Sequence, residues 1–350
     1  PKNDSKLFAK GTAAKLTCCS AGIEQGTFES LADHWQRLIE GCNEPTFFDS
    51  QAWQKTWWSE FHGDSELKLL VVRSESGDVN MIAPLMIDGS EISFLGSTDL
   101  VDYHDFLTRD RLTPNCIQSI VSHIDEMTEI DKILLQSLPG NSPTITQFRE
   151  AAEQAGWNVE LEQEDVAPRL DLPSTWDEYV SSLRKKDRHE LRRKLRRLEA
   201  AGEVRQIELS DPVEVEEAMA DFMRLHRMST PDKNEFMTAD REQFFCKAAV
   251  ELARQGSTRL CFLEVDGERE ATSLSFVSGN VRYLYNSGYN PAQSKLSVGL
   301  LNHALAIKSS IEAGHRVFDF MRGNESYKYH LGGIDRQVFA LTATRRSQAK

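Results

Sequence analysis

The pattern of hydrophobic and polar positions is clearest in the second half of the chain, where it predicts a strand followed by two helices. Residues 203–209 (EVRQIEL) are predicted as a strand. Asp211 followed by Pro212 indicates a helix start, because aspartate caps free N–H groups and proline fits the first helical position. One apolar face runs along this helix through Val215, Met219, Phe222 and Leu225. A second helix is predicted over 239–254, ending before Gly256.

The remaining elements of this half are separated by short turn sequences. Asp266-Gly267 and Gly279-Asn280 are typical of two-residue hairpin turns, so the strands around them form an antiparallel meander. The predicted elements are strands at 258–265, 270–277 and 281–289, a helix at 296–313, a strand at 316–320, a polar segment at 322–333 and a strand at 337–344. A helix joins parallel neighbours, which a two-residue turn cannot do. The order therefore predicts a mixed sheet with helices on its faces.

The first half shows a weaker version of the same order of elements. Predicted helices lie at 28–40, 49–61, 114–127 and 143–155, and predicted strands at 67–73, 79–87, 91–95, 132–136 and 157–162. Two halves of similar order predict a duplicated α/β fold with a mixed sheet. We place the boundary near 167–174, which contains Pro168 and Pro173. The expected parts are a flexible N-terminal extension, a first domain and a second domain, at 1–27, 28–166 and 167–350.

Charge is unevenly distributed along a chain that is acidic overall, with a net charge of −13. Residues 181–200 hold nine lysines and arginines against three carboxylates. Leu191, Leu195 and Leu198 form an apolar stripe there, which predicts a basic helix. Three interpretations of its polar face are open. It is a solvated surface, a groove for a phosphate-bearing ligand or a nucleic-acid patch. An acidic chain with one basic helix and no interleaved aromatic residues fits the nucleic-acid class poorly.

The length and composition of the chain bear on the number of domains and on the cellular location. With 350 residues, 40% hydrophobic and 27% charged, the chain is long for one globular domain. No apolar run approaches the length of about 18 residues that suggests a membrane span, and the first twenty residues lack the apolar core of a secretory signal. The six cysteines show neither metal-ligand spacing nor a dense disulfide framework. We expect reduced thiols, no metal site and a cytoplasmic location.

Several segments resemble acetyltransferases of the GNAT superfamily. In the second half they are YLYNSGYNP (283–291), SVGLLNHALAIKSSIEAG (297–314) and VFDFMRGNESYK (317–328). In the first half they are FFDSQAWQKTWWSEF (47–61), MIAPLMI (81–87) and FLGSTDLVDYHDF (94–106). Together they resemble the CelD-like subfamily, named after a cellulose-biosynthesis protein and similar to the FemABX-type aminoacyltransferases. The basic segment 188–202 also resembles the arginine-rich helix that opens the second domain of those enzymes. The resemblance covers 45–345 and implies two tandem GNAT-like domains.

The resemblance implies transfer of an acyl group from coenzyme A to an amine or hydroxyl. GNAT proteins hold the pyrophosphate at the start of the helix after the third meander strand, where free N–H groups and the helix dipole attract phosphate. Here the predicted donor-binding residues at that position are Lys295, Ser297, Val298 and Gly299. The glycine-rich pattern of the family is reduced to Gly299, with Ser297 in the place of the first glycine. Ser297 either contributes to phosphate binding or only caps the helix.

Candidates for the acid and the base follow from the same comparison. Tyr289 stands at the exit of the strand beside the expected thioester, where a phenol can protonate the leaving thiolate unless it belongs to the core. Asp319 and Glu325 are the nearest candidate bases. Asp319 alternates with two phenylalanines in a strand. A carboxylate there is either a base or half of an ion pair with Arg322 or Lys328.

A second polar cluster, LVDYHDF at 100–106, lies in the first half. It lines the cleft between the halves or forms a polar turn before the next helix. The histidine between two aspartates is a natural proton acceptor near neutral pH. The cations of the second half can hold an anionic group of the substrate. The predicted acceptor-binding residues are Asp102, Tyr103, His104 and Asp105 of this cluster, with Arg322, Tyr327 and Lys328 of the second half.

Three functional hypotheses follow. The first is an enzyme that moves an acyl group from acyl-CoA to an amine or hydroxyl of a polar acceptor, such as a saccharide derivative, bound between the domains. Polysaccharide biosynthesis is the setting that the subfamily resemblance implies. The second is a FemABX-like aminoacyl or peptidyl transferase that uses aminoacyl-tRNA, which is the one nucleic acid expected as a partner. The third is a GNAT scaffold without catalysis, favoured by the single-glycine cradle.

Overall fold

The structure, a computed structural model, describes residues 22–42, 44–108 and 114–346. The strands of the first half are β1 (Ile23–Gly26), β2 (Glu66–Arg73), β3 (Val79–Asp88), β4 (Glu91–Phe94), β5 (Leu107–Thr108), β6 (Lys132–Pro139) and β7 (Trp157–Asp171). Its helices are α1 (Phe28–Glu40), α2 (Gln51–Phe61), α3 (Pro114–Glu126) and α4 (Thr144–Gln154), with the 3-10 helix η1 (Phe47–Asp49). Residues 1–21 of the predicted N-terminal extension lie outside the described residues, and its end forms β1, which pairs with β2.

The second half repeats this order with more helices. Its strands are β8 (Val204–Leu209), β9 (Thr258–Val265), β10 (Glu268–Ser278), β11 (Val281–Tyr289), β12 (Val317–Asp319) and β13 (Ile334–Arg345). Its helices are α5 (Trp176–Ser182), α6 (Lys185–Glu199), α7 (Pro212–Ser229), α8 (Pro231–Phe236), α9 (Ala239–Arg254), α10 (Val298–Glu312) and α11 (Ser326–His330), with the 3-10 helix η2 (Pro291–Leu296). The predicted start of α7 is confirmed, because Asp211 accepts hydrogen bonds from the N–H groups of Val213 and Glu214.

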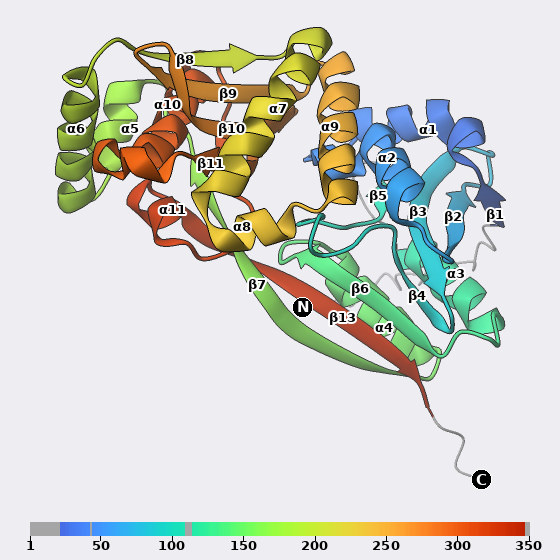
Figure 1. Ribbon diagram of the computed structural model, residues 1–350. Coiled ribbons are helices and arrows are strands. Elements are labelled where there is room, and N and C mark those ends of the chain that lie inside the picture. The colour runs from blue at the N-terminus through green and yellow to red at the C-terminus, as the bar shows by residue number, and fades with distance from the viewer. Residues whose placement is uncertain (1–21, 43, 109–113, 347–350) are drawn as a thin grey trace, which may run out of the picture.

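Each half contributes its last strand to the sheet of the other half. β7, the last strand of the first half, pairs with β12, whereas β13, the last strand of the chain, pairs with β6. β7 and β13 also pair with each other and run antiparallel from one half to the other (Figure 1). The result is one sheet of 13 strands in the order β1-β2-β3-β4-β6-β13-β7-β12-β11-β10-β9-β8, with β5 beside β3. The predicted mixed sheet in a tandem α/β fold is confirmed.

β7 continues to Asp171, whereas the sequence predicted a strand that ends at 162. Proline normally interrupts a central strand, because it has no N–H group for the ladder. The carbonyl of Pro168 accepts a hydrogen bond from the N–H of Phe320. The backbone of this residue therefore faces the side of β12, and the missing N–H removes no bond to β13.

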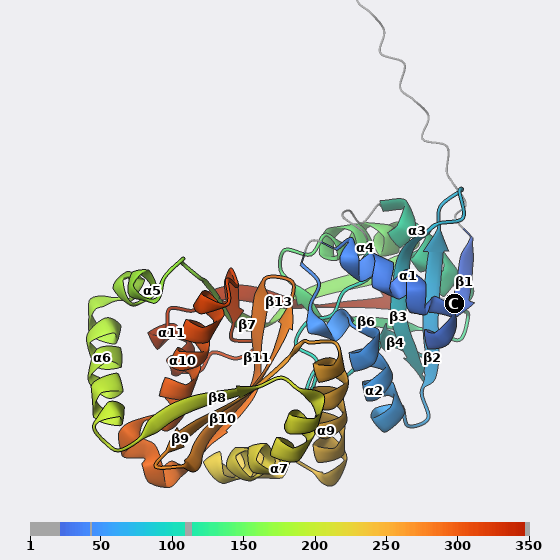
Figure 2. The same cartoon turned by 90° about the horizontal axis from the view of Figure 1, so that it is seen from above.

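Helices cover both faces of the sheet in the second half (Figure 2). α7 and α9 pack on one face of β9–β11, and α10 packs on the other. Neighbouring β9 residues belong to different hydrophobic clusters: Phe262 to the one that contains Phe222 and Phe245, and Leu263 to the one that contains Leu301. A strand with both faces covered is hydrophobic almost throughout, which is why its sequence shows little alternation.

An aromatic cluster joins the two halves. The rings of Phe47 in η1 and Phe276 in β10 lie 4.5 Å apart between centroids. The ring of Trp53 in α2 lies 5.0 Å from that of Phe244 in α9 and 5.3 Å from that of Tyr285 in β11. Contacts of this kind bury large apolar areas. The halves therefore share one hydrophobic core, which fixes the loops of the first half against the strands of the second.

Candidate active site

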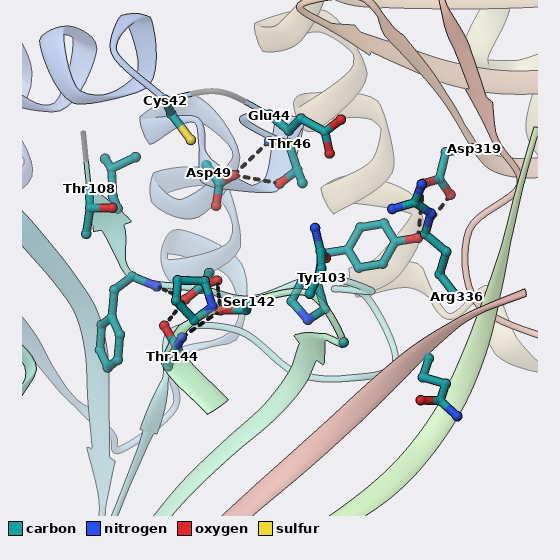
Figure 3. A pocket seen from close by; sticks show the side chains of 18 of the residues that line it. Cys42, Glu44, Thr46, Asp49, Tyr103, Thr108, Ser142, Thr144, Asp319 and Arg336 are labelled. Atoms are coloured by element: carbon teal, nitrogen blue, oxygen red, sulfur yellow. Dashed lines mark hydrogen bonds between the residues drawn. The ribbon is translucent and has the colours of Figure 1, made fainter. Parts of the chain in front are cut away.

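A cavity of about 710 Å³ lies between the two halves (Figure 3). The first half lines it with residues of the segments 42–49, 103–108 and 139–147. The later strands add Arg169, Tyr283, Asp319 and Arg336. Figure 3 shows the Tyr103 ring reaching toward Asp319, with Ser142 and Thr144 on the opposite side. Of the predicted site residues, the structure brings Tyr103, Asp105 and Asp319 together at this cavity.

Asp319 and Tyr103 meet across the two halves. The Tyr103 hydroxyl donates to the two carboxylate oxygens of Asp319, at 3.0 and 3.1 Å, and the N–H of Met321 donates at 2.8 Å. Burial raises the pKa of Asp319 to about 6, although the hydrogen bonds from Tyr103 and Met321 favour the ionised form. The sequence offered Arg322 or Lys328 as ion-pair partners, but the carboxylate is held by a phenol and a backbone N–H instead. Such a group can take up a proton near neutral pH.

Arg169 stands beside Asp319 and was missed by the sequence analysis. It is in register with Asp319 on the neighbouring strand, β7. Its two terminal nitrogens donate to the carboxylate of Glu44 at 2.9 and 3.1 Å. The available indication was a charged residue within the stretch VAPRLDL, which the sequence analysis treated as a domain boundary. Glu44 offered no such indication, because it lies in a loop.

Two carboxyl groups form the first-half wall of the cavity. Asp105 accepts hydrogen bonds from the hydroxyls of Ser142 and Thr144, at 2.5 and 2.6 Å. Asp49 accepts from the N–H and the hydroxyl of Thr46, at 2.7 and 2.9 Å. Burial raises the pKa of Asp49 to about 6 and also raises the pKa of Asp105. This wall therefore presents carboxyl and hydroxyl groups to a polar ligand.

Asp102 and His104 do not line the cavity, although their neighbours Tyr103 and Asp105 do. Asp102 accepts a hydrogen bond from the backbone N–H of Arg322 at 3.1 Å. His104 is buried, and its ring stacks 5.4 Å from that of Phe94. Burial lowers the pKa of His104 to about 4, because the charged imidazolium is poorly solvated there. His104 is therefore neutral at pH 7 and differs from the near-neutral proton acceptor that its neighbours suggested.

Lys328 holds the turn after β12 in shape. Its ammonium group donates to the carbonyls of Met321, at 2.9 Å, and Gly323, at 3.1 Å, and pairs with Glu325 at 2.9 Å. The Lys328 residue is 2% exposed, whereas the Glu325 side chain is 58% exposed. Neither residue lines the cavity. The observed contacts of Lys328 are those of a clamp on the backbone beside Asp319.

Arg322 and Tyr327 also contact other parts of the protein. Arg322 donates to the Ser137 hydroxyl at 2.9 Å and pairs with Glu164 at 3.4 Å, which ties the turn to the first half. The Tyr327 ring stacks on the ring of His303, with 5.1 Å between centroids. Neither Arg322 nor Tyr327 lines the cavity. Their predicted role in acceptor binding stays a prediction.

The predicted donor cradle lies at the start of α10, away from the cavity lining. Ser297 is the N-cap residue by position, yet its side chain makes no capping hydrogen bond. Its φ of 58° is left-handed, which explains why a glycine suits this position in the family pattern. Val298 is buried, and Lys295 precedes the helix with its carbonyl accepting a hydrogen bond from Arg197 at 2.8 Å. The first N–H groups of α10 thus lie next to the Ser297 hydroxyl, which makes no capping hydrogen bond.

Tyr289 is linked to this cradle by packing. A Cβ atom at Gly299 would lie 3.0 Å from Cδ1 of the Tyr289 ring, so only glycine allows the present contact without a shift. Tyr289 therefore lies against the first turn of α10 and does not line the cavity of Asp319. Its predicted role as the acid stays a prediction.

The described ranges of the chain contain no group of three or more histidine, cysteine, aspartate or glutamate side chains arranged to hold a metal ion. Within the same ranges, no helix is both long enough and apolar enough to cross a bilayer.

Residues 185–329 match the family model described as an acetyltransferase (GNAT) domain. The matched segment runs from α6 to α11 and contains Asp319 and the start of α10. A comparison with curated proteins found no match.

Solved structures are similar to about nine tenths of the chain, well beyond the segment 185–329. FemX matches with a TM-score of 0.63 and 12% identity, over 91% of this chain and 96% of that chain. The C-terminal domain of a putative lysylphosphatidylglycerol synthetase from Agrobacterium fabrum matches with a TM-score of 0.57 and 12% identity, over 89% of this chain and 92% of that chain. A tandem GNAT protein from the clavulanic acid biosynthesis pathway matches with a TM-score of 0.52 and 13% identity, over 93% of this chain and 99% of that chain. At these identities the similarity shows the fold, and the CelD-like subfamily stays a prediction.

Proposed function

We propose that the protein transfers an acyl group from acyl-CoA to an amine or hydroxyl of a polar acceptor held in the cavity between the halves. The observation that carries this proposal is the place of Asp319. It belongs to the GNAT domain, lines the cavity and has a pKa raised to about 6. A carboxylate with that pKa is a better general base at neutral pH than an ordinary aspartate.

In this mechanism the acceptor nitrogen or oxygen attacks the thioester carbon, and its proton passes to Asp319. The Tyr103 hydroxyl orients the carboxylate through its two hydrogen bonds. The tetrahedral intermediate then collapses, the C–S bond breaks, and the thiolate of coenzyme A leaves with a proton. Tyr289 stays the predicted acid and Glu325 the predicted second base, and neither lines the cavity at which Asp319 acts.

We place the pyrophosphate of the donor at the start of α10. The free N–H groups of the first turn and the helix dipole favour a phosphate there. Lys295 adds a positive charge, the Ser297 hydroxyl is not used for capping, and Val298 and Gly299 provide backbone N–H groups of the first turn. These features support the fit of a phosphate to this end of the GNAT domain.

Calorimetric titration with acetyl-CoA and longer acyl-CoAs, followed by transfer assays with polar amines and alcohols, tests the proposal. Asp319→Asn should lower kcat/KM by about 100-fold, which is typical for loss of a general base. Asp88→Asn is the matched control, because Asp88 is exposed at the end of β3. An unchanged rate in a folded Asp319→Asn variant would remove Asp319 from the mechanism. Absence of binding by every acyl-CoA would favour another donor or a scaffold without catalysis.

A second candidate, an aminoacyl transferase that uses aminoacyl-tRNA, is favoured by the position of α6. This basic helix lies at the outer edge of the second half in both views (Figures 1 and 2). Arg192, Arg193 and Arg196 are exposed on it. Binding of tRNA that weakens steeply with salt and is lost when these arginines are replaced by alanine would support this candidate. Salt-independent or absent tRNA binding would exclude it.

A further inference from the structure

The backbone next to Asp319 adopts a conformation that residues with side chains disfavour. Met321 has a φ of 63°, in the left-handed region, and its side chain is buried. Strain of this kind persists only where the surrounding structure holds the residue in place. The N–H of Met321 donates to the carboxylate of Asp319 at 2.8 Å, so the strained residue supplies one of the hydrogen bonds of the candidate base.

The ammonium group of Lys328 holds this turn from its carbonyl side. It donates to the carbonyls of three consecutive residues, Met321, Arg322 and Gly323, at 2.9, 2.5 and 3.1 Å. A lysine ammonium has three N–H donors and no acceptor, so the three carbonyls match its donors in number. Lys328 is buried, and hydrogen bonds from a charged donor are about twice as strong as those between neutral groups. These contacts offset the strain at Met321, because one of them fixes the carbonyl of that same residue.

The N–H side of the turn is attached to other parts of the fold. The N–H groups of Phe320 and Gly323 donate to two carbonyls of β7, each at 2.9 Å. The N–H of Arg322 donates to the carboxylate of Asp102 at 3.1 Å. Removal of the Lys328 ammonium therefore leaves these attachments in place and releases the carbonyls of residues 321–323. The backbone at 321 is then free to leave its left-handed conformation.

Several charged and titratable groups face Asp319 from the elements around it. They are Tyr103 and Asp102 of the first half, Arg169 in register on β7 and Tyr283 in register on β11. The phenol of the first half and the guanidinium favour the ionised form of Asp319, whereas the second carboxylate disfavours it. Burial raises the pKa of Tyr283 well above its usual value, so this phenol stays neutral. Lys328 contacts the carbonyls of the turn and pairs with Glu325, so its effect on Asp319 passes through the Met321 N–H.

We propose that Lys328 is a positioning residue for the candidate base: it holds Met321 in the left-handed conformation and so keeps the Met321 N–H on the carboxylate of Asp319. The inference rests on the proposed function, in which Asp319 accepts the proton, and adds the residue that adjusts the strength of this base. An N–H donor favours the ionised carboxylate. Loss of Lys328 should therefore raise the pKa of Asp319.

The Met321 amide reports on this contact in protein with isotope-labelled methionine. The chain has eight methionines, so the spectrum contains few signals. In wild-type protein the Met321 N–H resonance should shift with a midpoint near pH 6, as Asp319 loses its proton. Lys328→Leu removes the ammonium group and its donors, so the midpoint should rise by about one pH unit, the size expected for one hydrogen bond to a charged group. An unchanged midpoint in the folded variant would overturn the inference.

Lys233→Leu is the matched control. The ammonium of Lys233 also donates to a backbone carbonyl of the second half, that of Ser287 in β11, and it makes no contact with the turn carbonyls that Lys328 holds. Its replacement should leave the midpoint of the Met321 resonance where it is in wild type. Equal shifts in both variants would mean that loss of a positive charge, and not release of the turn, changes Asp319, which would also overturn the inference.

A measurement on the wild-type chain covers the case in which Lys328→Leu does not fold. The Met321 N–H and the side-chain carboxyl carbon of Asp319 should titrate with the same midpoint, and an amide resonance that does not move with the carboxyl group would refute the link between them. The acid limb of kcat/KM separates this inference from the proposed function. A raised midpoint in Lys328→Leu with an unchanged acid limb would leave the inference intact and remove Asp319 from the proposed mechanism.

Discussion

The carboxyl group of Asp319 links the stability of the protein to pH. Burial raises its pKa from 3.8 to about 6, so the folded chain holds this proton more tightly than the unfolded chain. As the pH rises from about 4 to about 6, the free energy of unfolding therefore falls, by about 3 kcal/mol for this group. Above about pH 6 the group is ionised in both states, and no further loss occurs. The same burial that makes Asp319 a useful base thus makes it a cost to stability at neutral pH.

Asp319→Asn should remove this pH dependence. The amide does not titrate, so the stability of the variant relative to wild type should improve by about 3 kcal/mol between pH 4 and pH 7. Chemical denaturation at both pH values measures the difference directly. Comparing the two proteins cancels the other buried carboxyl groups, Asp49, Asp102 and Asp105. A constant difference between variant and wild type across this range would show that Asp319 titrates normally.

Tyr103→Phe should move the pH dependence of catalysis. The phenol donates to both oxygens of Asp319 and so favours the ionised carboxylate. Without it, the acid limb of kcat/KM should shift upward by about one pH unit, the size expected for one hydrogen bond to a charged group. Tyr285→Phe is the control, because its hydroxyl also bridges the halves but donates to the carbonyl of Leu100. Equal shifts in both variants would point to a general loosening between the halves.

The start of α10 offers a prediction at the scale of one element. Ser297 has a φ of 58°, which costs a non-glycine residue about 1–2 kcal/mol. Ser297→Gly should therefore raise the free energy of unfolding by about 1 kcal/mol, somewhat less because glycine loses more entropy on folding. It should also weaken acetyl-CoA binding about fivefold, through loss of one hydroxyl contact to phosphate. Thermal denaturation and calorimetry give both numbers, and unchanged affinity would remove the Ser297 side chain from the donor site.

Elements with a strong local pattern could be predicted from the sequence, and elements defined by distant partners could not. The capped, amphipathic α7 begins at Pro212, as predicted. β7 was predicted too short, because its second part pairs only with strands far along the chain and contains Pro168. α8 and α11 have six and five residues, which is too short for a helical period to appear.

The residues of the candidate site likewise fall into those that could be predicted from the sequence and those that could not. Asp319 could be predicted because it is a charged residue between two phenylalanines, and Tyr103 because it belongs to the polar cluster at 100–106. Both segments resemble a known family. Glu44 and Arg169 could not, because their relation exists only after a loop of the first half is placed against β7. Local spacing carries no information about that contact. The site residues that the sequence did not predict are those that contacts with distant parts of the chain bring to the cavity.

At the scale of the whole molecule, the exchange of last strands couples the two halves. β13 belongs to the C-terminal end of the chain, yet it pairs with β6 of the first half and with β7. The domain limits 28–166 and 167–350 stay a prediction. Strands within each of these two segments pair with strands that belong to the other segment. The site has the same dependence, because the Tyr103–Asp319 contact joins the halves and the Glu44–Arg169 pair holds a first-half loop against β7, which pairs with β12 and β13.

We therefore expect a single cooperative unfolding transition. Five of the six tryptophans lie in the first half, so fluorescence reports mainly on that half, and circular dichroism reports on the whole chain. The two curves and the loss of acyl transfer should coincide in denaturant. A chain that stops at 333 should be insoluble, because removing β13 leaves the apolar faces of β6 and β7 with an open edge in the middle of the sheet. A chain that stops at 346 keeps β13 and is the matched control. Two separate transitions, or a soluble chain ending at 333 with native circular dichroism, would mean that each half folds without the strand of the other.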